Sequence, residues 1–190
     1  MKKMTLTRIT ALFLAALLTM AMLAGCGKGN GGSESADCPY DTAVDMLNVV
    51  WDNGNWEFPA VGGNFESSVD NAPGALPISD TDTMTAMLLI PEDVQAKVKD
   101  AATVFHMMNT NMFTGAALIL DGMSADEAAT KLKEAFLANQ FMCGAPEKIV
   151  IYTVGTGLVY AYGLAVNIDE VKAAAEKLEG AKLVVEENYM

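Results

Sequence analysis

The chain is 190 residues long, and its 24 acidic and 12 basic residues give it a formal charge of −12 at pH 7. All the acidic residues lie after Cys26, and the part of the chain from Cys26 onwards contains lysines but no arginine. Nucleic-acid binding depends on neutralising phosphates with basic side chains, so this composition argues against a nucleic-acid partner. The length suits a single domain.

The first 25 residues have the pattern of an export signal. Basic residues near the start precede an uncharged apolar run over 9–24, which is too short for a comfortable transmembrane helix. The run ends in Leu23-Ala24-Gly25-Cys26, which resembles the lipobox of bacterial lipoproteins. The resemblance implies that residues 1–25 are cleaved and that Cys26 carries lipid. A lipid anchor would then hold the chain on the extracytoplasmic face of the cell membrane.

Residues 26–38 are rich in glycine and serine and predict a flexible tether, followed by one α+β domain over 39–190. Two cysteines remain after Cys26, namely Cys38 and Cys143. An even pair outside the cytoplasm suggests a disulfide, although the sequence does not show that the two residues are close. The chain has no C-x-x-C motif, which argues against a thioredoxin-type redox role.

The first predicted element of the domain is a helix over 42–51, with Asp41 as its N-cap and apolar residues at helical spacing. Residues 54–83 contain several glycines and prolines without sustained periodicity, which predicts a long loop with at most short extended pieces. We expect three aromatic side chains to hold this loop against the core: Trp56, Phe58 and Phe65.

Residues 91–120 allow two interpretations. Pro91 followed by two acidic residues predicts a first helical turn, and the helix is expected to continue through Val98 and Ala101. Residues 103–108 then either extend this helix or form a strand that turns at Asn109-Thr110-Asn111 into a second strand. The asparagines tolerate the turn conformations required, which favours the hairpin.

From residue 112 onwards the predicted order is strand, helix, strand, strand, helix, strand. The strands are expected over 116–120, 148–154, 158–164 and 182–186, with Gly155-Thr156-Gly157 as the hairpin turn between the middle two. The helices are expected to begin at the caps Ser124 and Asn167 and to end near Asn139 and Gly180. This β-α-β-β-α-β order predicts a ferredoxin-like split βαβ fold, with both helices on one face of an antiparallel sheet.

Candidate site residues are few. His106 is the only histidine and is interpreted as a structural residue, because triads and zinc sites need partners that the chain lacks. Soft ligand types for copper(I) are His106, Met107, Met108 and Met112, but core packing explains them better. Oxygen ligands for calcium are Glu66, Asp70, Asp80 and Asp82, but their spacing does not match an EF-hand loop. The sequence therefore predicts no catalytic residue, no metal site and no cofactor.

The stretch from Pro91 onwards resembles a family of small, uncharacterised lipoproteins of Gram-positive anaerobes. The likeness is carried by His106-Met107-Met108-Asn109, Phe113-Thr114, Met142-Cys143-Gly144 before Pro146-Glu147-Lys148, and Tyr160-Ala161-Tyr162-Gly163. The resemblance implies a lipid-anchored location and an α+β fold. Some members carry the label "bacteriocin transport accessory protein", but the chain has no thioredoxin-like motif to match that role.

The anchor, the single domain and the lack of catalytic groups predict a non-enzymatic surface lipoprotein, an accessory or binding domain that acts through protein contacts. The alternative is a small-ligand or metal-binding module that uses the 54–83 loop against the sheet. A third hypothesis, an unrecognised enzyme, requires carboxylates that converge in one pocket.

Overall fold

The computed structural model describes residues 37–189. The expected signal peptide over 1–25, the lipobox residues Leu23, Ala24 and Gly25, and the lipidation site Cys26 lie outside the described residues, as does most of the expected tether. The described helices and strands run from Ala43 to Asn188 and form a mixed α+β structure.

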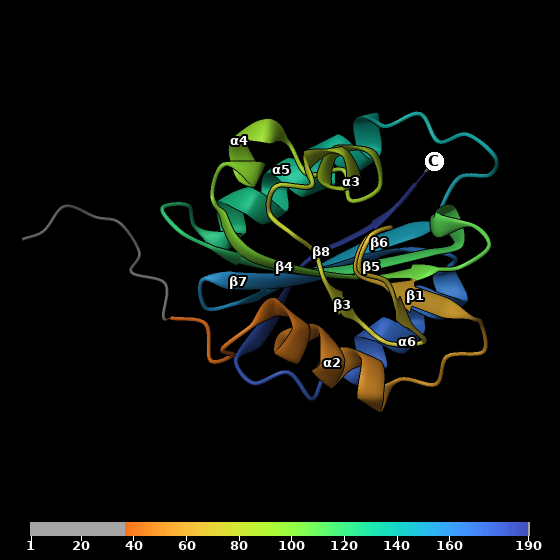
Figure 1. Ribbon diagram of the computed structural model, residues 1–190, viewed down its shortest axis with the longest axis horizontal. Coiled ribbons are helices and arrows are strands. Elements are labelled where there is room, and N and C mark those ends of the chain that lie inside the picture. The colour runs from red at the N-terminus through yellow and green to blue at the C-terminus, as the bar shows by residue number, and fades with distance from the viewer. Residues whose placement is uncertain (1–36, 190) are drawn as a thin grey trace, which may run out of the picture. The chain divides into compact units, whose positions relative to one another are not determined.

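An open antiparallel sheet of eight strands forms the centre (Figure 1). Its strand order is β2-β1-β4-β5-β7-β6-β8, and β3 also pairs with β4. The strands are β1 (Ala60–Gly62), β2 (Val69–Asp70), β3 (Gly74–Ala75), β4 (Val98–His106), β5 (Phe113–Leu120), β6 (Lys148–Val154), β7 (Gly157–Gly163) and β8 (Ala181–Asn188).

Helices cover both faces of this sheet, so the domain has three layers (Figure 1). One face carries α3 (Thr81–Ala86), α4 (Glu92–Gln95) and α5 (Ala125–Ala138), and the other carries α2 (Ala43–Asn53) and α6 (Ala165–Ala175). A short 3-10 helix, η1 (Thr110–Met112), joins β4 to β5. Every residue of β5 and β7 is buried, because both of their faces lie under helices. Burial on both faces explains why these strands are continuous apolar runs rather than alternating ones.

The predicted ferredoxin-like arrangement is not confirmed. β8 pairs with β6 at the edge of the sheet, whereas a split βαβ fold would place its last strand beside β5. That position beside β5 is already taken, since β4 forms a hairpin with β5 and covers its other side.

The prediction that both helices share one face is also wrong. The crossovers β5-α5-β6 and β7-α6-β8 step in the same direction across the sheet, but β5 and β7 run antiparallel. Two crossovers of the same hand must then place their helices on opposite faces. Accordingly, α5 packs in one core cluster, with residues such as Leu132, and α6 packs in the other, with residues such as Val171.

The β4–β5 hairpin confirms the favoured interpretation of the middle of the chain, with Phe105 opposite Thr114. The helix predicted from Pro91 is much shorter than expected, because α4 ends at Gln95 and both Val98 and Ala101 belong to β4. Apolar residues three or four apart fit a helix, but here they lie on a strand that is buried on both faces at its centre.

Two helix starts differ from the prediction, and in both helices a carboxylate from a distant part of the chain accepts from the first helical N–H. Thr42, not Asp41, is the N-cap of α2, and the carboxylate of Asp100 accepts from the Ala43 N–H at 2.7 Å. Ser124 caps α5 as predicted. The cap predicted at Asn167 is wrong: α6 begins at Ala165, whose N–H donates to the Glu147 carboxylate at 2.7 Å. Both carboxylates come from distant parts of the chain, so local sequence gives no sign of them.

The 54–83 segment is mostly loop, as predicted, and its short strands fasten it to β4. The Thr103 hydroxyl of β4 donates to the Gly63 carbonyl at 2.7 Å. Glycine is required at Gly62 and Gly74, because a Cβ on Gly62 would lie 2.3 Å from the Gly74 nitrogen. Trp56 and Phe58 pack in the core cluster that contains α2, as expected, with Trp56 stacked on Trp51 at 4.8 Å.

Candidate functional site

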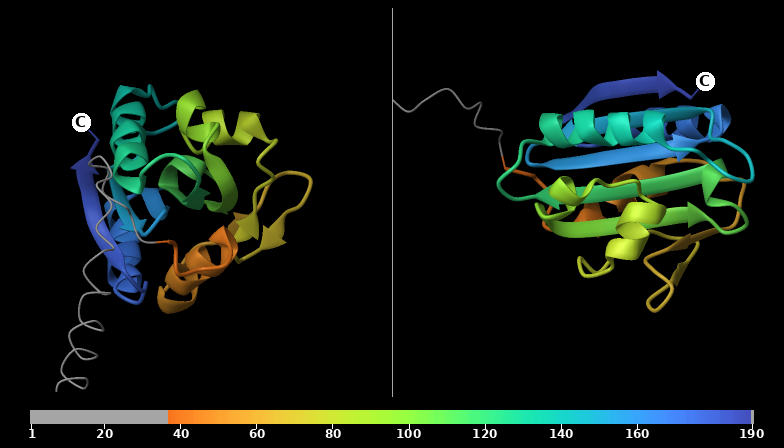
Figure 2. Two further views of the ribbon diagram at one scale, coloured as in Figure 1. Left: turned by 90° about the vertical axis from the view of Figure 1, so that its left-hand side faces the viewer. Right: turned by 90° about the horizontal axis from the view of Figure 1, so that it is seen from above.

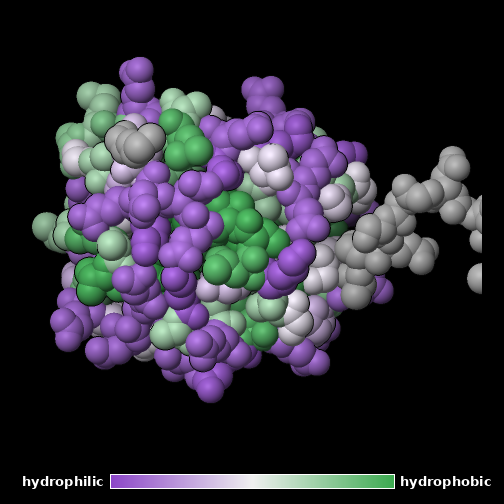
Figure 3. Space-filling view, turned by 180° about the vertical axis from the view of Figure 1, so that it is seen from behind, coloured by the Kyte–Doolittle hydropathy of each residue, from purple (hydrophilic) through white to green (hydrophobic). Residues whose placement is uncertain are grey.

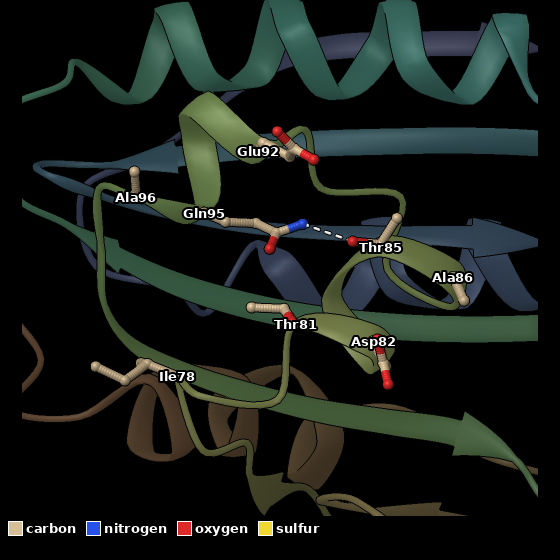
Figure 4. Close-up of a pocket in the computed structure, with 8 residues that line it drawn as sticks. All are labelled: Ile78, Thr81, Asp82, Thr85, Ala86, Glu92, Gln95 and Ala96. Atoms are coloured by element: carbon tan, nitrogen blue, oxygen red, sulfur yellow. Dashed lines mark hydrogen bonds between the residues drawn. The ribbon is translucent and has the colours of Figure 1, made fainter.

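A groove of about 770 Å³ lies between α3 and α4 (Figure 4). It is lined by Ile78, Thr81, Asp82, Thr85, Ala86, Glu92, Gln95 and Ala96. The lining combines apolar surface with two carboxylates, two hydroxyls and one amide, and none of these residues is basic. The groove therefore favours an occupant that brings positive charge or hydrogen-bond donors.

Gln95 fixes the floor of this groove. Its side-chain amide donates to the Thr85 hydroxyl at 2.9 Å and to the Ile90 carbonyl at 2.7 Å, which ties α4 to α3. Figure 4 shows Glu92 and Asp82 on opposite sides of the Gln95–Thr85 bond. The two carboxylates lie on different sides of this bridge, so each can contact a different group of an extended partner.

Asp80 positions α3 at the edge of the groove. Its carboxylate caps the helix by accepting from the Thr83 N–H at 3.0 Å, and it also accepts from the Asn64 amide at 2.8 Å. The bond from the Thr83 backbone, followed by that from Asn64, holds the pKa of Asp80 below its usual value. Asp80 is therefore a structural carboxylate that joins α3 to the loop that contains Asn64.

Replacement of this cap gives a first prediction. Asp80→Ala is expected to lower the free energy of unfolding by about 1 kcal/mol at neutral pH, because the first turn of α3 loses its cap. Since the folded-state pKa is lowered, the stabilisation is fully present above a pH of about 4 and is lost as the pH falls through the folded-state value. Urea titrations at neutral and acid pH measure this difference, and Asp82→Ala, which removes an exposed acid without a cap bond, is the control. Equal losses in the two variants would contradict the assignment.

Two tyrosines of β7 hold the connection between α3 and α4. The Tyr160 hydroxyl donates to the Leu88 carbonyl at 2.9 Å, and the Tyr162 hydroxyl donates to the Met87 carbonyl. Leu89 follows with φ of +57°, a conformation that costs a branched side chain energy and needs such support. Burial raises the pKa of Tyr162 to about 12 and that of Tyr160 well above its usual value. The groove thus depends on two neutral phenols in the core.

The hairpin formed by β1 and β2 carries an exposed aromatic residue. This hairpin projects from the body of the domain in both views of Figure 2. The Asn64 side-chain oxygen accepts from the N–H groups of Glu66 and Ser67 at 3.2 and 3.0 Å, which closes the loop. Phe65 is fully exposed at this turn, so the prediction that it holds the loop against the core is wrong. Asn64 also bonds to Asp80, which places Phe65 on the loop next to α3.

His106 serves the turn after β4. It is 8% exposed, its Nδ1 accepts from the N–H groups of Met108 and Asn109, and its ring stacks on Phe58 at 5.0 Å. These contacts match the structural interpretation of this residue. Met107 and Met108 are exposed instead of packed in the core, contrary to the core-packing interpretation of the methionines.

The acidic residues considered for calcium do not form a ligand set. Asp80 is occupied by Thr83 and Asn64, and both Glu66 and Asp70 are exposed. Between residues 37 and 189, no three His, Cys, Asp or Glu residues lie together in a way that would hold a metal ion.

Cys38 and Cys143 are both free, so the suggested disulfide is not formed in this structure. The Cys38 N–H donates to Thr156 in the β6–β7 turn, whereas the Cys143 carbonyl accepts from Asn109 beside η1. These places lie at opposite ends of β7, roughly 20 Å apart at about 3.3 Å per residue. A disulfide requires Cα atoms within about 7 Å. An even cysteine count carries no information on that distance.

The exposed Cys143 sits on a turn that two asparagines support. Asn111 donates to the carbonyls of Met142 and Gly144, both at 2.8 Å, and Asn109 donates to that of Cys143. Cys143 has φ of +63°, which these bonds help to maintain. This turn belongs to the connection between α5 and β6, and its thiol is open to solvent.

None of the helices within residues 37–189 is long and apolar enough to cross a membrane. No family model, curated protein or solved structure matches the chain. The resemblance to small Gram-positive lipoproteins therefore stays a prediction.

Proposed function

We propose that this chain is an extracytoplasmic lipoprotein, anchored through lipid on Cys26, whose domain binds a partner protein and is not an enzyme. The basic start, the apolar run and the Leu23-Ala24-Gly25-Cys26 motif support the anchor. Membership of the Gram-positive lipoprotein family is part of the same proposal.

The observation that carries the binding role is the fully exposed Phe65 on a hydrogen-bonded hairpin. Large exposed aromatic side chains are characteristic anchors of protein interfaces, and burial of one contributes roughly 1.5–3 kcal/mol. Because Asn64 closes the turn and bonds to Asp80, the hairpin loses little conformational entropy when Phe65 docks.

The groove beside α3, the helix to which Asn64 is tied through Asp80, defines the chemistry of the partner. Ile78, which is 55% exposed, lies at the groove and adds apolar surface, while Asp82 and Glu92 add negative charge without basic neighbours in the lining. An open groove of this kind suits a segment of protein that presents an apolar residue next to a lysine or arginine.

The binding role is tested with Phe65→Ser in the full chain, used as bait for proteins from detergent-solubilised membranes. Recovery of the partner is expected to fall about tenfold or more, because an aromatic anchor is lost, while the thermal midpoint stays unchanged. Val166→Ser is the matched control, since Val166 is a 72% exposed apolar residue on α6, across the sheet. Identical protein sets from wild type and Phe65→Ser would refute the proposal.

The anchor is tested by the intact mass of the protein extracted from membranes. Loss of residues 1–25 together with added acyl chains is expected, and Cys26→Ser should abolish both changes. A chain that is cleaved but carries no lipid would be a diffusible secreted domain, and the accessory role would lose its main support.

The polar lining of the groove favours a second candidate, the binding of a small cationic or hydroxylated ligand. Thermal-shift measurements with calcium, copper and common cationic and hydroxylated nutrients test it. Stabilisation that disappears in the Asp82→Asn, Glu92→Gln double variant would support the ligand role. No stabilisation by any of these compounds would remove this candidate.

A further inference from the structure

The outer edge of β8 is open. Among the described residues, β8 pairs with β6 alone, so the backbone groups along its other side meet no strand there. β8 is outermost at the rear of the domain (Figure 2), and Figure 3 shows an apolar patch at the centre of this rear face, ringed by hydrophilic residues. Within β8, Leu183 is 40% exposed and Val184 is partly buried. An open edge with an apolar centre is a template for another strand.

The charged residues of β8 differ in whether they form ion pairs within the chain. Its acidic end is neutralised within the chain, where Glu186 pairs with Lys148 and Lys172, and Glu187 pairs with Lys133. Lys182, near the start of the strand, forms no ion pair with any described residue. The edge is thus locally free of the repulsion that the overall charge of −12 would create between two copies.

Lys182 and Glu187 point to the same face of the sheet. Glu187 stands opposite Ile149 and pairs with Lys133 of α5, so it faces α5. Lys182 stands opposite Thr153, which lies four residues along β6 from Ile149 and therefore on the same face. Cross-strand partners in an antiparallel pair lie on one face, so these two residues can meet across an edge.

We propose that β8 pairs antiparallel with β8 of a second copy of this chain, which extends the sheet across a two-fold axis between Val184 and Val185. In this register, Lys182 of each copy lies opposite Glu187 of the other, and Val184 lies opposite Val185. Because the two copies are related by a two-fold axis, each contact occurs twice. A shift by two residues in either direction removes both ion pairs, so the charges select one register.

The irregularity of β8 is compatible with this pairing. The register between β6 and β8 shifts at Ile151/Tyr152, which leaves Val184 as the extra residue of a bulge. Bulges and charges at a sheet edge prevent indiscriminate pairing, and here they leave one self-complementary arrangement open. This inference does not depend on the partner proposed for Phe65.

Charge exchange tests the proposal, with native mass spectrometry of the full chain in detergent as the measurement. Wild type is expected as a dimer, and Lys182→Glu and Glu187→Lys should each raise the dimer dissociation constant about tenfold or more, because like charges then face each other twice. The double variant Lys182→Glu, Glu187→Lys should restore the dimer. Lys177→Glu makes the same charge change at an exposed lysine outside β8 and should leave the dimer intact.

Circular dichroism of each variant separates loss of pairing from loss of folding. A wild-type chain that stays monomeric at every concentration would overturn the proposal. A dimer dissociation constant that neither single charge reversal changes would show that the copies meet elsewhere and would overturn the proposal. Failure of the double variant to restore the dimer would overturn it as well.

Discussion

Phe136→Ala is expected to lower the free energy of unfolding by about 3–5 kcal/mol, because the truncation leaves a cavity where the ring of Phe136 packs against other aromatic rings. Phe136 is fully buried, and its ring centroid lies 5.5 Å from that of Phe141 and 5.6 Å from those of Tyr162 and Tyr189. These rings come from the helix, the connection that follows it, β7 and the end of the chain. One truncation therefore loosens four segments at once.

Urea denaturation followed by circular dichroism measures this loss. Leu137→Ala is the matched control. Leu137 is the next residue on α5 and is 44% exposed, so its truncation should cost less than about 1 kcal/mol. Small domains are stable by about 5–15 kcal/mol in total, so the Phe136 variant should lose a large fraction of its stability. Equal midpoints for the two variants would show that this aromatic cluster does not secure α5.

Local patterns were sufficient for the elements whose signals lie within a few residues. The capping box at Ser124 defines the start of α5, and the Gly155-Thr156-Gly157 turn defines the β6–β7 hairpin. The two asparagines beside Thr110 predicted the β4–β5 turn, where Asn109 accepts from the Asn111 N–H at 2.9 Å. In each case the side chains that fix the backbone are neighbours in sequence.

The order of the strands could not be predicted in the same way. A β-α-β-β-α-β pattern is compatible with the last strand at either edge of the four-stranded unit, and the choice depends on what already occupies β5. Here β4 occupies it, and the sequence left open whether residues 103–108 form a strand or the end of a helix. One local ambiguity thus decided both the position of β8 and the face on which α6 lies.

The candidate site was only partly predictable. Asn64 followed three residues later by Ser67 is a pattern typical of a side-chain-closed turn, so the hairpin itself had a signal. The exposure of Phe65 had none, because an isolated phenylalanine is by default a core residue. The groove depends on Asp80 and on tyrosines more than seventy residues away in sequence, which no local pattern reveals.

Alkaline pH should destabilise the domain through Tyr160 and Tyr162. Burial raises both pKa values, that of Tyr162 to about 12, so the folded state keeps protons that the unfolded chain releases from a pH of about 10. The folded state then binds more protons, and stability falls as the pH rises through this interval. For Tyr162 the rise of the pKa from 10 to about 12 corresponds to roughly 3 kcal/mol, which is fully lost only above the folded-state pKa, and Tyr160 adds to this loss.

The double variant Tyr160→Phe, Tyr162→Phe should be less stable than wild type near neutral pH and more stable at alkaline pH. At a pH of about 8 it should be less stable than wild type by roughly 2 kcal/mol, because the carbonyls of Met87 and Leu88 lose their donors. At a pH of about 11 and above it should become the more stable protein, since it has no phenol to ionise in the core. Urea midpoints across this range measure the crossover. Parallel pH profiles for the two proteins would show that these phenols titrate as exposed groups and do not secure the α3–α4 connection.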